Sequence, residues 1–252
     1  MDVHAVPGHG VPRDEVRVEG LRVVEVVHAP ALCIMAHAHD IAKICIVLDG
    51  AVSERCGHDV LAPQPYEPVY RRADAPHANQ YHVAGARSLI VELDADRRVR
   101  DGLLVDRASG CALSARLVAA FGARASSRRR LVRAAVTAMR EAFAAGRPGT
   151  PSWLEASREA LATRAAAPPS LAELGGALGV HPVYLAQAFR AHWGTTTRAF
   201  VRAHRVFQAI ELIERGRSLA EAATQAGFAD QSHMTRAIRS ARGATPGALR
   251  RS

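Results

Sequence analysis

The sequence predicts an α+β protein of two domains, with an antiparallel β barrel in its N-terminal part and an all-α module in its C-terminal part. Three observations support this prediction. Short β-rich runs fill the first third of the chain, helical stripes follow from about residue 99, and residues 170–200 recur, loosely rewritten, at 218–249. We therefore divide the 252 residues into a barrel region at 1–95, a helical region at 96–150 and a helical module at 151–252.

The first third contains several runs that are rich in β-branched residues, and some of them end at Gly or Asp. Short runs of this kind, separated by turn residues, are typical of the strands of a small sandwich or barrel. They cover residues 21–29, 31–38, 42–50, 51–57 and 87–94.

The middle of the chain changes to a helical period. Residues 113–123 and 128–145 carry apolar side chains at helical spacing. The segment GRPGTPS at 146–152 is rich in Gly and Pro and indicates a linker before a helix that begins at Trp153. The middle helices could pack only on the barrel or pair across a two-fold axis, and we favour the pairing.

Each copy of the repeat opens with a capping box, formed by Ser170 with Glu173 and by Ser218 with Glu221. A glycine follows nine residues after each opening serine, at Gly179 and then at Gly227, and glycine supplies the positive φ of a tight turn. Each copy therefore predicts a short helix, a turn and a second helix, at residues 170–194 and 218–243.

The second helix of each copy has one apolar face and one polar face. The apolar stripes predict packing of Tyr184, Leu185, Ala188 and Phe189 in the first copy and of Met234, Ala237 and Ile238 in the second. Gln and Arg, which dominate the other face, make bidentate contacts to adenine and guanine edges in the major groove. The outward residues are Val183, Gln187 and Arg190 in the first copy and Gln231, Ser232, Thr235, Arg236 and Arg239 in the second.

A single helix is predicted between the two copies. The segment has apolar residues at Val206, Ile210 and Ile213, no proline, and a terminating glycine at Gly216. Such a rod could hold the two outward faces roughly 34 Å apart, which is one turn of B-DNA. We therefore expect contact with two successive major grooves of double-stranded DNA.

Residues 153–251 resemble the DNA-binding domain of the AraC/XylS family of bacterial transcription regulators. The likeness is carried by GFADQSH at 227–233, by Thr235-Arg236 and by GATP at 243–246. The resemblance implies that the bases are contacted by Val183, Gln187, Gln231, Ser232 and Arg236. It assigns Arg190, Arg202 and Arg239 to phosphates.

The barrel region carries a second resemblance. The pair His37 and His39 lies on one face of a predicted strand, and together with His77 it is similar to the two short motifs of the cupin barrel, the usual sensor domain of this regulator family. Lys43 or Ile44 stands where metal-binding cupins have a glutamate, and a cation there opposes a metal. We expect the three histidines to line an effector pocket, with structural histidines and a metal site as the alternatives.

Charge and cysteine content agree with this assignment. The net charge of +9 divides into −5 over residues 1–95, +8 over 96–167 and +6 over 168–252, so the excess of basic residues lies where phosphates would be met. The four cysteines form no C-x-x-C pair, which favours reduced thiols over a metal knuckle. The chain has no apolar run of about 20 residues and no signal peptide at its start, so we expect a cytoplasmic protein without membrane contact.

The sequence thus predicts a transcriptional regulator and not an enzyme. We expect its barrel to sense a small-molecule effector without a cofactor, and the chain to form a homodimer. Its module would bind a DNA operator and would contact or block RNA polymerase. One alternative, a metal-dependent cupin enzyme with a fused helical domain, needs a complete ligand set. Another, a DNA-alkylation repair protein, needs a reactive cysteine in a metal-bound cluster, whereas Cys33, Cys45, Cys56 and Cys111 all lie outside the helical module.

Overall fold

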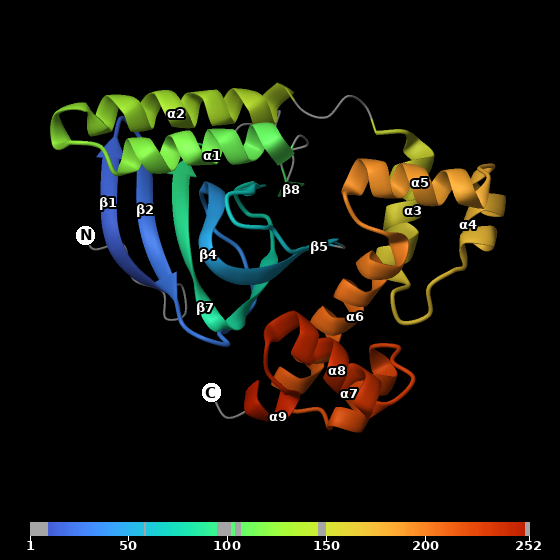
Figure 1. Ribbon diagram of the computed structural model, residues 1–252. Helices are drawn as coiled ribbons and strands as arrows, with labels where there is room; N and C mark the ends of the chain where they lie inside the picture. Colours follow the sequence, from blue (N-terminus) through green and yellow to red (C-terminus); the bar gives the residue numbers. More distant parts are fainter. Residues whose placement is uncertain (1–9, 58, 95–101, 104–106, 146–149, 250–252) are drawn as a thin grey trace. The chain divides into compact units, whose positions relative to one another are not determined.

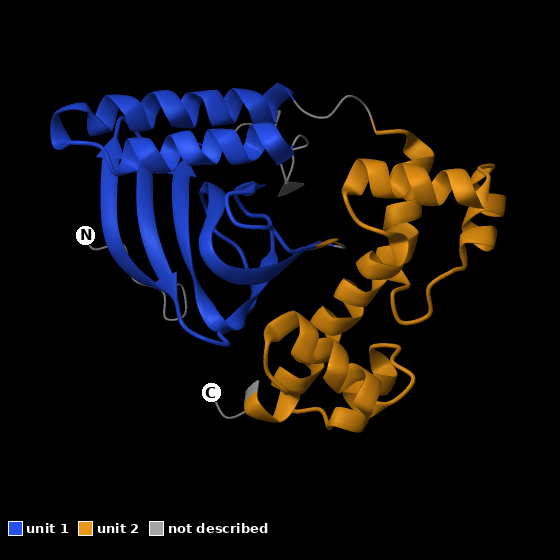
Figure 2. Ribbon diagram, viewed as in Figure 1, with its two compact units in different colours: residues 1–57, 61–147 blue, residues 58–60, 148–252 orange. Residues whose placement is uncertain are grey.

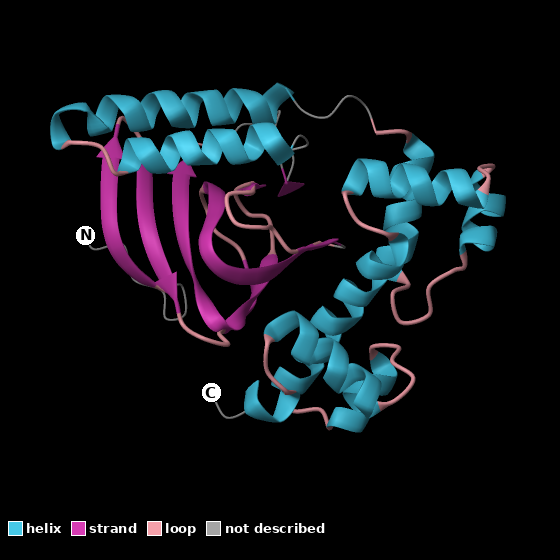
Figure 3. Cartoon of the chain, viewed as in Figure 1, coloured by secondary structure: helices cyan, strands magenta, loops and turns pink. Residues whose placement is uncertain are grey.

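The computed structural model describes residues 10–57, 59–94, 102–103, 107–145 and 150–249 (Figure 1). The chain forms two compact units, which we call the sheet unit (residues 1–57 and 61–147) and the helical unit (58–60 and 148–252) (Figure 2). Figure 3 shows that strands and two long helices make up the first unit, and that helices make up the bulk of the second. The predicted α+β class is therefore confirmed.

The strands join in one sheet of order β1-β2-β7-β4-β6-β8, with β3 paired to β7 and β5 to β4. The pairs β1–β2, β2–β7, β3–β7, β4–β7, β4–β6 and β6–β8 are antiparallel. The strands are β1 (Val11–Val18), β2 (Leu21–His28), β3 (Cys33–His37), β4 (Ala42–Cys56), β5 (Asp59–Leu61), β6 (Pro68–Arg71), β7 (His77–Leu93) and β8 (Gly102–Leu103).

The predicted runs at 42–50 and 51–57 form a single strand, β4, rather than two. Its pairing with β7 shifts register between Gly50 and Val52, an irregularity that bends a strand, and Figure 1 shows β4 as a curved strand. Gly50 has φ +80°, and a Cβ on it would lie 2.2 Å from the carbonyl oxygen of Gly85. The glycine predicted to end a strand therefore allows the strand to continue through a tight bend.

Two helices, α1 (Arg107–Phe121) and α2 (Ala125–Ala145), pack on one face of the sheet (Figure 1). Their buried side chains, such as Leu117 and Met139, share one apolar cluster with Ile44 and Val91 of the sheet. The helical region predicted at 96–150 therefore supplies a layer of the sheet unit. Because side chains alternate along a strand, residues such as Lys43 face away from these helices.

The helical unit contains seven helices within the described residues 150–249. They are α3 (Ser152–Thr163), α4 (Leu171–Leu178), α5 (Pro182–Trp193), α6 (Thr197–Glu214), α7 (Leu219–Gln225), α8 (Gln231–Arg242) and α9 (Pro246–Leu249). In the first half of this unit, Leu185 and Phe189 of α5 pack with Leu154 of α3 and Phe200 of α6. Most of the predicted linker at 146–152 lies outside the described residues. None of the helices in the described ranges combines the length and the apolarity that a membrane crossing requires.

Candidate nucleic-acid interface

Both predicted capping boxes are present at the starts of α4 and α7. The hydroxyl of Ser170 accepts a hydrogen bond from the backbone N–H of Glu173 at 3.1 Å, and the Glu173 carboxylate accepts one from the N–H of Ser170 at 2.7 Å. The same two bonds join Ser218 and Glu221, at 3.2 and 2.9 Å. The hydrogen bonds from the serines lower the pKa of both carboxyl groups. The two copies that the sequence predicts therefore also share the same hydrogen bonds at the starts of their first helices.

The two turns differ in how tightly they are packed. Gly179 caps α4 in the left-handed region at φ +66° and has open space around it, whereas the close approach is made by Gly175, whose added Cβ would lie 2.5 Å from the Val180 oxygen. In the second copy Gly227 has φ +78°, and a Cβ on it would lie 2.1 Å from the oxygen of Ala166. The second turn therefore rests against the segment that joins α3 to α4.

The second helix of the first copy, α5, buries Leu185 and Phe189 and exposes Gln187 and Arg190. Val183, at its N-terminal turn, has 58% of its surface exposed. The prediction that Tyr184 packs in the core is wrong, since this side chain is 59% exposed. Leu185 and Phe189 already define the buried stripe, and the residue before Leu185 is rotated about 100° away from that stripe.

The second helix of the second copy, α8, buries Met234, Ala237 and Ile238, as predicted. Its exposed residues include Gln231, Ser232, Arg236 and Arg239. Thr235 is half-buried, because it lies beside the buried stripe rather than opposite to it.

The helix between the two copies, α6, has 18 residues, which span about 27 Å. Its N-terminal part packs with the first copy through Phe200 and Val201, and the helix also contacts α7 and α8 of the second copy. Arg202 is exposed on its surface. Arg205 donates hydrogen bonds to the carbonyl oxygens of Ala165 at 2.7 Å and Ala166 at 3.2 Å, so this rod also fixes the segment against which Gly227 packs.

Four of the exposed arginines on these three helices, Arg190, Arg202, Arg236 and Arg239, form no ion pair with any residue that the structure describes. A guanidinium without an internal partner is available for a phosphate or for a guanine edge. The predicted DNA contacts thus occupy exposed positions on two equivalent helices and on the helix between them, with Thr235 as the half-buried exception.

The N-terminal caps of α5 and α8 were not predicted from the sequence. The Asp230 carboxylate accepts a hydrogen bond from the backbone N–H of His233 at 2.6 Å and caps α8. The Nδ1 atom of His181 accepts one from the N–H of Val183 at 3.3 Å and caps α5. An Asp at the start of a helix is a recognisable signal, whereas a histidine cap is not. Both caps set the first turn of a helix whose next residues are predicted to contact DNA.

In the sheet unit, the structure brings together the three histidines singled out in the sequence. One ring nitrogen from each of His37, His39 and His77 lies within 4.8 Å of the others. The Nδ1 atoms of His37 and His77 lie 2.9 and 3.0 Å from the carbonyl oxygens of Met35 and Ala75, a contact that fixes the ring orientation. Three ligands of one zinc ion would lie about 3.3 Å apart, so the cluster would have to contract to hold one.

The electrostatic surroundings of this cluster differ from the expectation that Lys43 stands beside it. Burial lowers the pKa of His77, Glu54 raises it, and among the other contributions Arg71 lowers it. Lys43 instead pairs with Glu92, at 3.6 Å. The pKa of His77 therefore depends on the buried Glu54 and Arg71, neither of which is a predicted site residue.

Comparisons with known proteins agree with this geometry. A family model described as a helix-turn-helix domain matches residues 174–252. No curated protein sequence matches the chain.

Among solved structures, the chain is similar to ToxT from Vibrio cholerae, with 11% identity, a TM-score of 0.42 and coverage of 92% of this chain and 98% of that chain. It is also similar to the AraC-like transcriptional activator CuxR, with 16% identity, a TM-score of 0.41 and coverage of 77% and 79%. The C-terminal domain of AraT, a response regulator from Geobacillus stearothermophilus, has 22% identity, a TM-score of 0.38 and coverage of 40% and 85%.

These likenesses are too distant to carry an argument about function, so the assignment rests on the family model and on the duplicated geometry of the helical unit. The helical unit of this chain therefore contains a helix-turn-helix domain, which the family model places at residues 174–252.

Proposed function

We propose that this chain is a sequence-specific transcriptional regulator that places α5 and α8 in successive major grooves of one operator. The observation that carries the proposal is the repetition of one arrangement: two helices, each capped at its N-terminus and buried along one stripe, expose Gln and Arg side chains on the other side. A single exposed Gln or Arg is ordinary on a helix surface. Two equivalent sets on a duplicated module are typical of DNA recognition.

We assign base contacts to the exposed Val183, Gln187, Gln231, Ser232 and Arg236. The two glutamines suit adenine and Arg236 suits guanine, while Val183 could contact only a thymine methyl. Phosphate contacts are assigned to Arg190, Arg202 and Arg239, and Thr235 contributes only its exposed part.

We propose that the sheet unit senses a small-molecule effector, with His37, His39 and His77 in the lining of the effector pocket. An effector changes operator binding only if it prefers one arrangement of the protein over another. Metal binding and a structural role remain the alternatives for the three histidines. Elemental analysis of protein purified without a histidine tag separates them, since one bound ion per chain would favour the metal site.

The proposed regulator acts in the cytoplasm as a homodimer, contacts RNA polymerase and has no enzymatic activity. Leu131 of α2 supports dimerisation, because 40% of its surface is exposed although the helix packs on the sheet elsewhere. Sedimentation at micromolar concentration tests the dimer, and a monomer would remove this element of the proposal.

Selection of duplexes from a random pool by the full chain tests the main proposal. We expect a recurring sequence that the chain prefers over random competitor at moderate salt. A variant with Gln231, Ser232 and Arg236 all replaced by Ala should lose this preference. Arg129→Ala, which removes an exposed charge from α2, should keep it. Equal binding of all duplexes by the unmodified chain would refute sequence-specific regulation.

A further inference from the structure

Arg71 is a buried cation with one unused donor. Its side chain is 2% exposed, and its Nε atom donates to the carboxylate of Glu54. The Nη1 atom donates to the carbonyl oxygen of Tyr70 at 2.8 Å. The Nη2 atom is buried and has no hydrogen-bond partner among the residues that the structure describes. A buried donor without a partner is destabilising, and it is more so on a charged group.

Lys43 stands directly opposite Arg71 on the neighbouring strand. The register pairs Lys43 with Arg71 and Ile44 with Tyr70. Ile44 and Tyr70 both belong to the cluster packed against α1 and α2, so Lys43 and Arg71 lie on the opposite face of the sheet. Directly opposite side chains have Cβ atoms about 4.5–5.5 Å apart, and like charges in such a pair repel each other.

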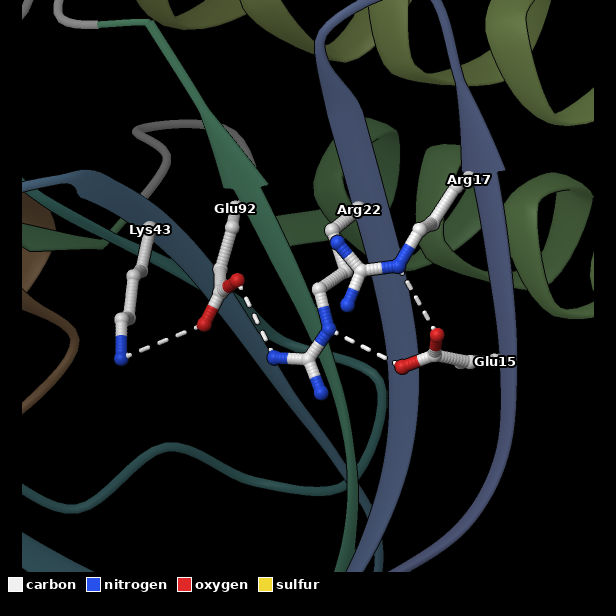
Figure 4. Close-up of polar contacts among 5 residues, drawn as sticks. All are labelled: Glu15, Arg17, Arg22, Lys43 and Glu92. Atoms are coloured by element: carbon white, nitrogen blue, oxygen red, sulfur yellow. Dashed lines mark hydrogen bonds and ion pairs between the residues drawn. The ribbon is translucent and has the colours of Figure 1, made fainter. Parts of the chain in front are cut away.

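Lys43 also ends a row of charges that crosses four strands (Figure 4). Glu15 binds Arg17 at 2.9 Å and Arg22 at 3.0 Å, and Glu92 binds Arg22 at 3.1 Å. Lys43 contacts Glu92 at 3.6 Å, beyond ordinary hydrogen-bond distance. Glu92 is therefore shared by two cations, and Lys43 has the longer contact.

With Arg71 and Glu54 added, the row contains four cations, Arg17, Arg22, Lys43 and Arg71, and three carboxylates, Glu15, Glu54 and Glu92. Exposure of the cations falls along the row, from 65% at Arg17 through 28% and 14% to 2% at Arg71. The row therefore has one excess positive charge, and water screens the charges least at the Lys43 and Arg71 end, where the side chains are most buried.

The same face becomes apolar a short distance along β4. Cys45 follows Lys43 on this face, and burial raises its pKa to about 11, so it remains a neutral thiol. Val47 comes next and belongs to an apolar cluster with Val52 and Tyr81. Positions two apart along a strand are separated by about 6.8 Å, so the neutral thiol of Cys45 lies within the length of one small molecule from Lys43, and Val47 lies about 13.6 Å from Lys43.

We propose that the Lys43 and Arg71 end of this face binds the carboxylate of a small organic acid, with Arg71 Nη2 and Lys43 Nζ as donors and the apolar part directed along β4 toward the neutral thiol of Cys45. One negative charge balances the single excess cation, whereas a phosphate dianion would exceed it. The inference depends on the proposed function only in naming this acid as the effector.

The test uses the full chain in differential scanning calorimetry, with sodium benzoate and sodium acetate as probes. Benzamide serves as the neutral isostere, and sodium chloride matches the ionic strength. We expect benzoate to raise the unfolding midpoint saturably, acetate to do so more weakly, and benzamide to have no effect. Lys43→Met should weaken benzoate binding at least about tenfold, as expected for loss of a charge-assisted bond. Arg17→Gln removes the same charge from the exposed end of the row and should leave binding unchanged.

Arg71→Gln alone would leave Glu54 buried without its cation and could unfold the sheet unit. The double variant Arg71→Gln with Glu54→Gln removes both charges together and should abolish the benzoate effect while the protein stays folded. The proposal is overturned if benzoate and acetate produce no saturable shift, if benzamide acts as well as benzoate, or if the double variant responds like the unmodified chain. Selection of duplexes with the same preparation separates the two proposals, since a chain that prefers an operator but ignores carboxylates remains a regulator without this site.

Discussion

Replacement of Gly227 by Ala should destabilise the helical unit far more than replacement of Gly179, although both glycines close helix-turn-helix turns. Both have positive φ, +78° and +66°, so alanine at either position bears the strain of the left-handed region. This strain amounts to about 1–2 kcal/mol and is partly offset by about 0.4–1 kcal/mol from the lower entropy of the unfolded chain. Backbone conformation alone therefore predicts a similar loss of about 1 kcal/mol for both variants.

The two glycines differ in the space around them, and this difference changes the expected loss of stability. Nothing lies within 4 Å of a Cβ added at Gly179, whereas a Cβ added at Gly227 would lie 2.1 Å from the oxygen and 2.5 Å from the Cα of Ala166. These are backbone atoms, and Arg205 holds the same segment through two hydrogen bonds. Overpacking against a fixed backbone adds about 1–3 kcal/mol, so the expected loss for Gly227→Ala is about 2–4 kcal/mol.

The tryptophan content of the chain gives a direct assay. Its two tryptophans, Trp153 and Trp193, both lie in the helical unit, so their fluorescence during urea unfolding reports on that unit alone. We expect the free energy of unfolding to fall by at least about 1 kcal/mol more for Gly227→Ala than for Gly179→Ala, with unchanged slopes. Losses that agree within about 0.5 kcal/mol would refute the close packing of the second turn.

Three further predictions concern single residues. Arg236→Ala should weaken binding to a selected operator by about 1–3 kcal/mol and relax the preference at one base pair, measured by fluorescence anisotropy; an equal loss on every duplex would show a phosphate contact only. Asp230→Ala should destabilise the helical unit by about 1 kcal/mol in urea, whereas Asp230→Asn keeps the cap, and a loss of the same size in both variants would argue against capping. The sheet unit should lose stability as the pH falls below about 6.5, because the lowered pKa of His77 favours the neutral ring in the folded state and protonation opposes folding. Amide hydrogen exchange in β7 would measure this loss, and His77→Gln should make stability less dependent on pH. If the pH dependence is the same in His77→Gln, groups other than His77 cause it.

The helical unit could be predicted in detail because its signals are local. Ser170 and Ser218 start helices with hydrogen bonds to residues three positions away, and the turn glycines act within a few residues. The prediction for Tyr184 is wrong because the helical spacing of apolar residues does not show where the buried stripe ends. An apolar residue next to the stripe fits the same spacing whether it is buried or exposed. Only the packed structure shows that Leu185 and Phe189 fill the core without it.

The sheet unit was predicted only in outline, because its pairings join residues far apart in the chain. The strand β6 has only four residues and all are buried, so it lacks the alternation of apolar and polar residues that predicts a strand. The pairing of Arg71 with Glu54, which lies 17 residues away, depends on the bend in β4. For the same reason the sequence could place His37 and His39 together but could not show that Lys43 pairs with Glu92.

The central claim is that one chain presents two equivalent helices to two successive major grooves. Hydroxyl-radical footprinting of the full chain on its selected operator tests this claim most directly. For each bound chain, the account predicts two protected patches on one side of the duplex, about 10–10.5 base pairs apart, with Gln187→Ala weakening one patch and Arg236→Ala the other. A single patch, or two patches that both weaken equally in each variant, would contradict it.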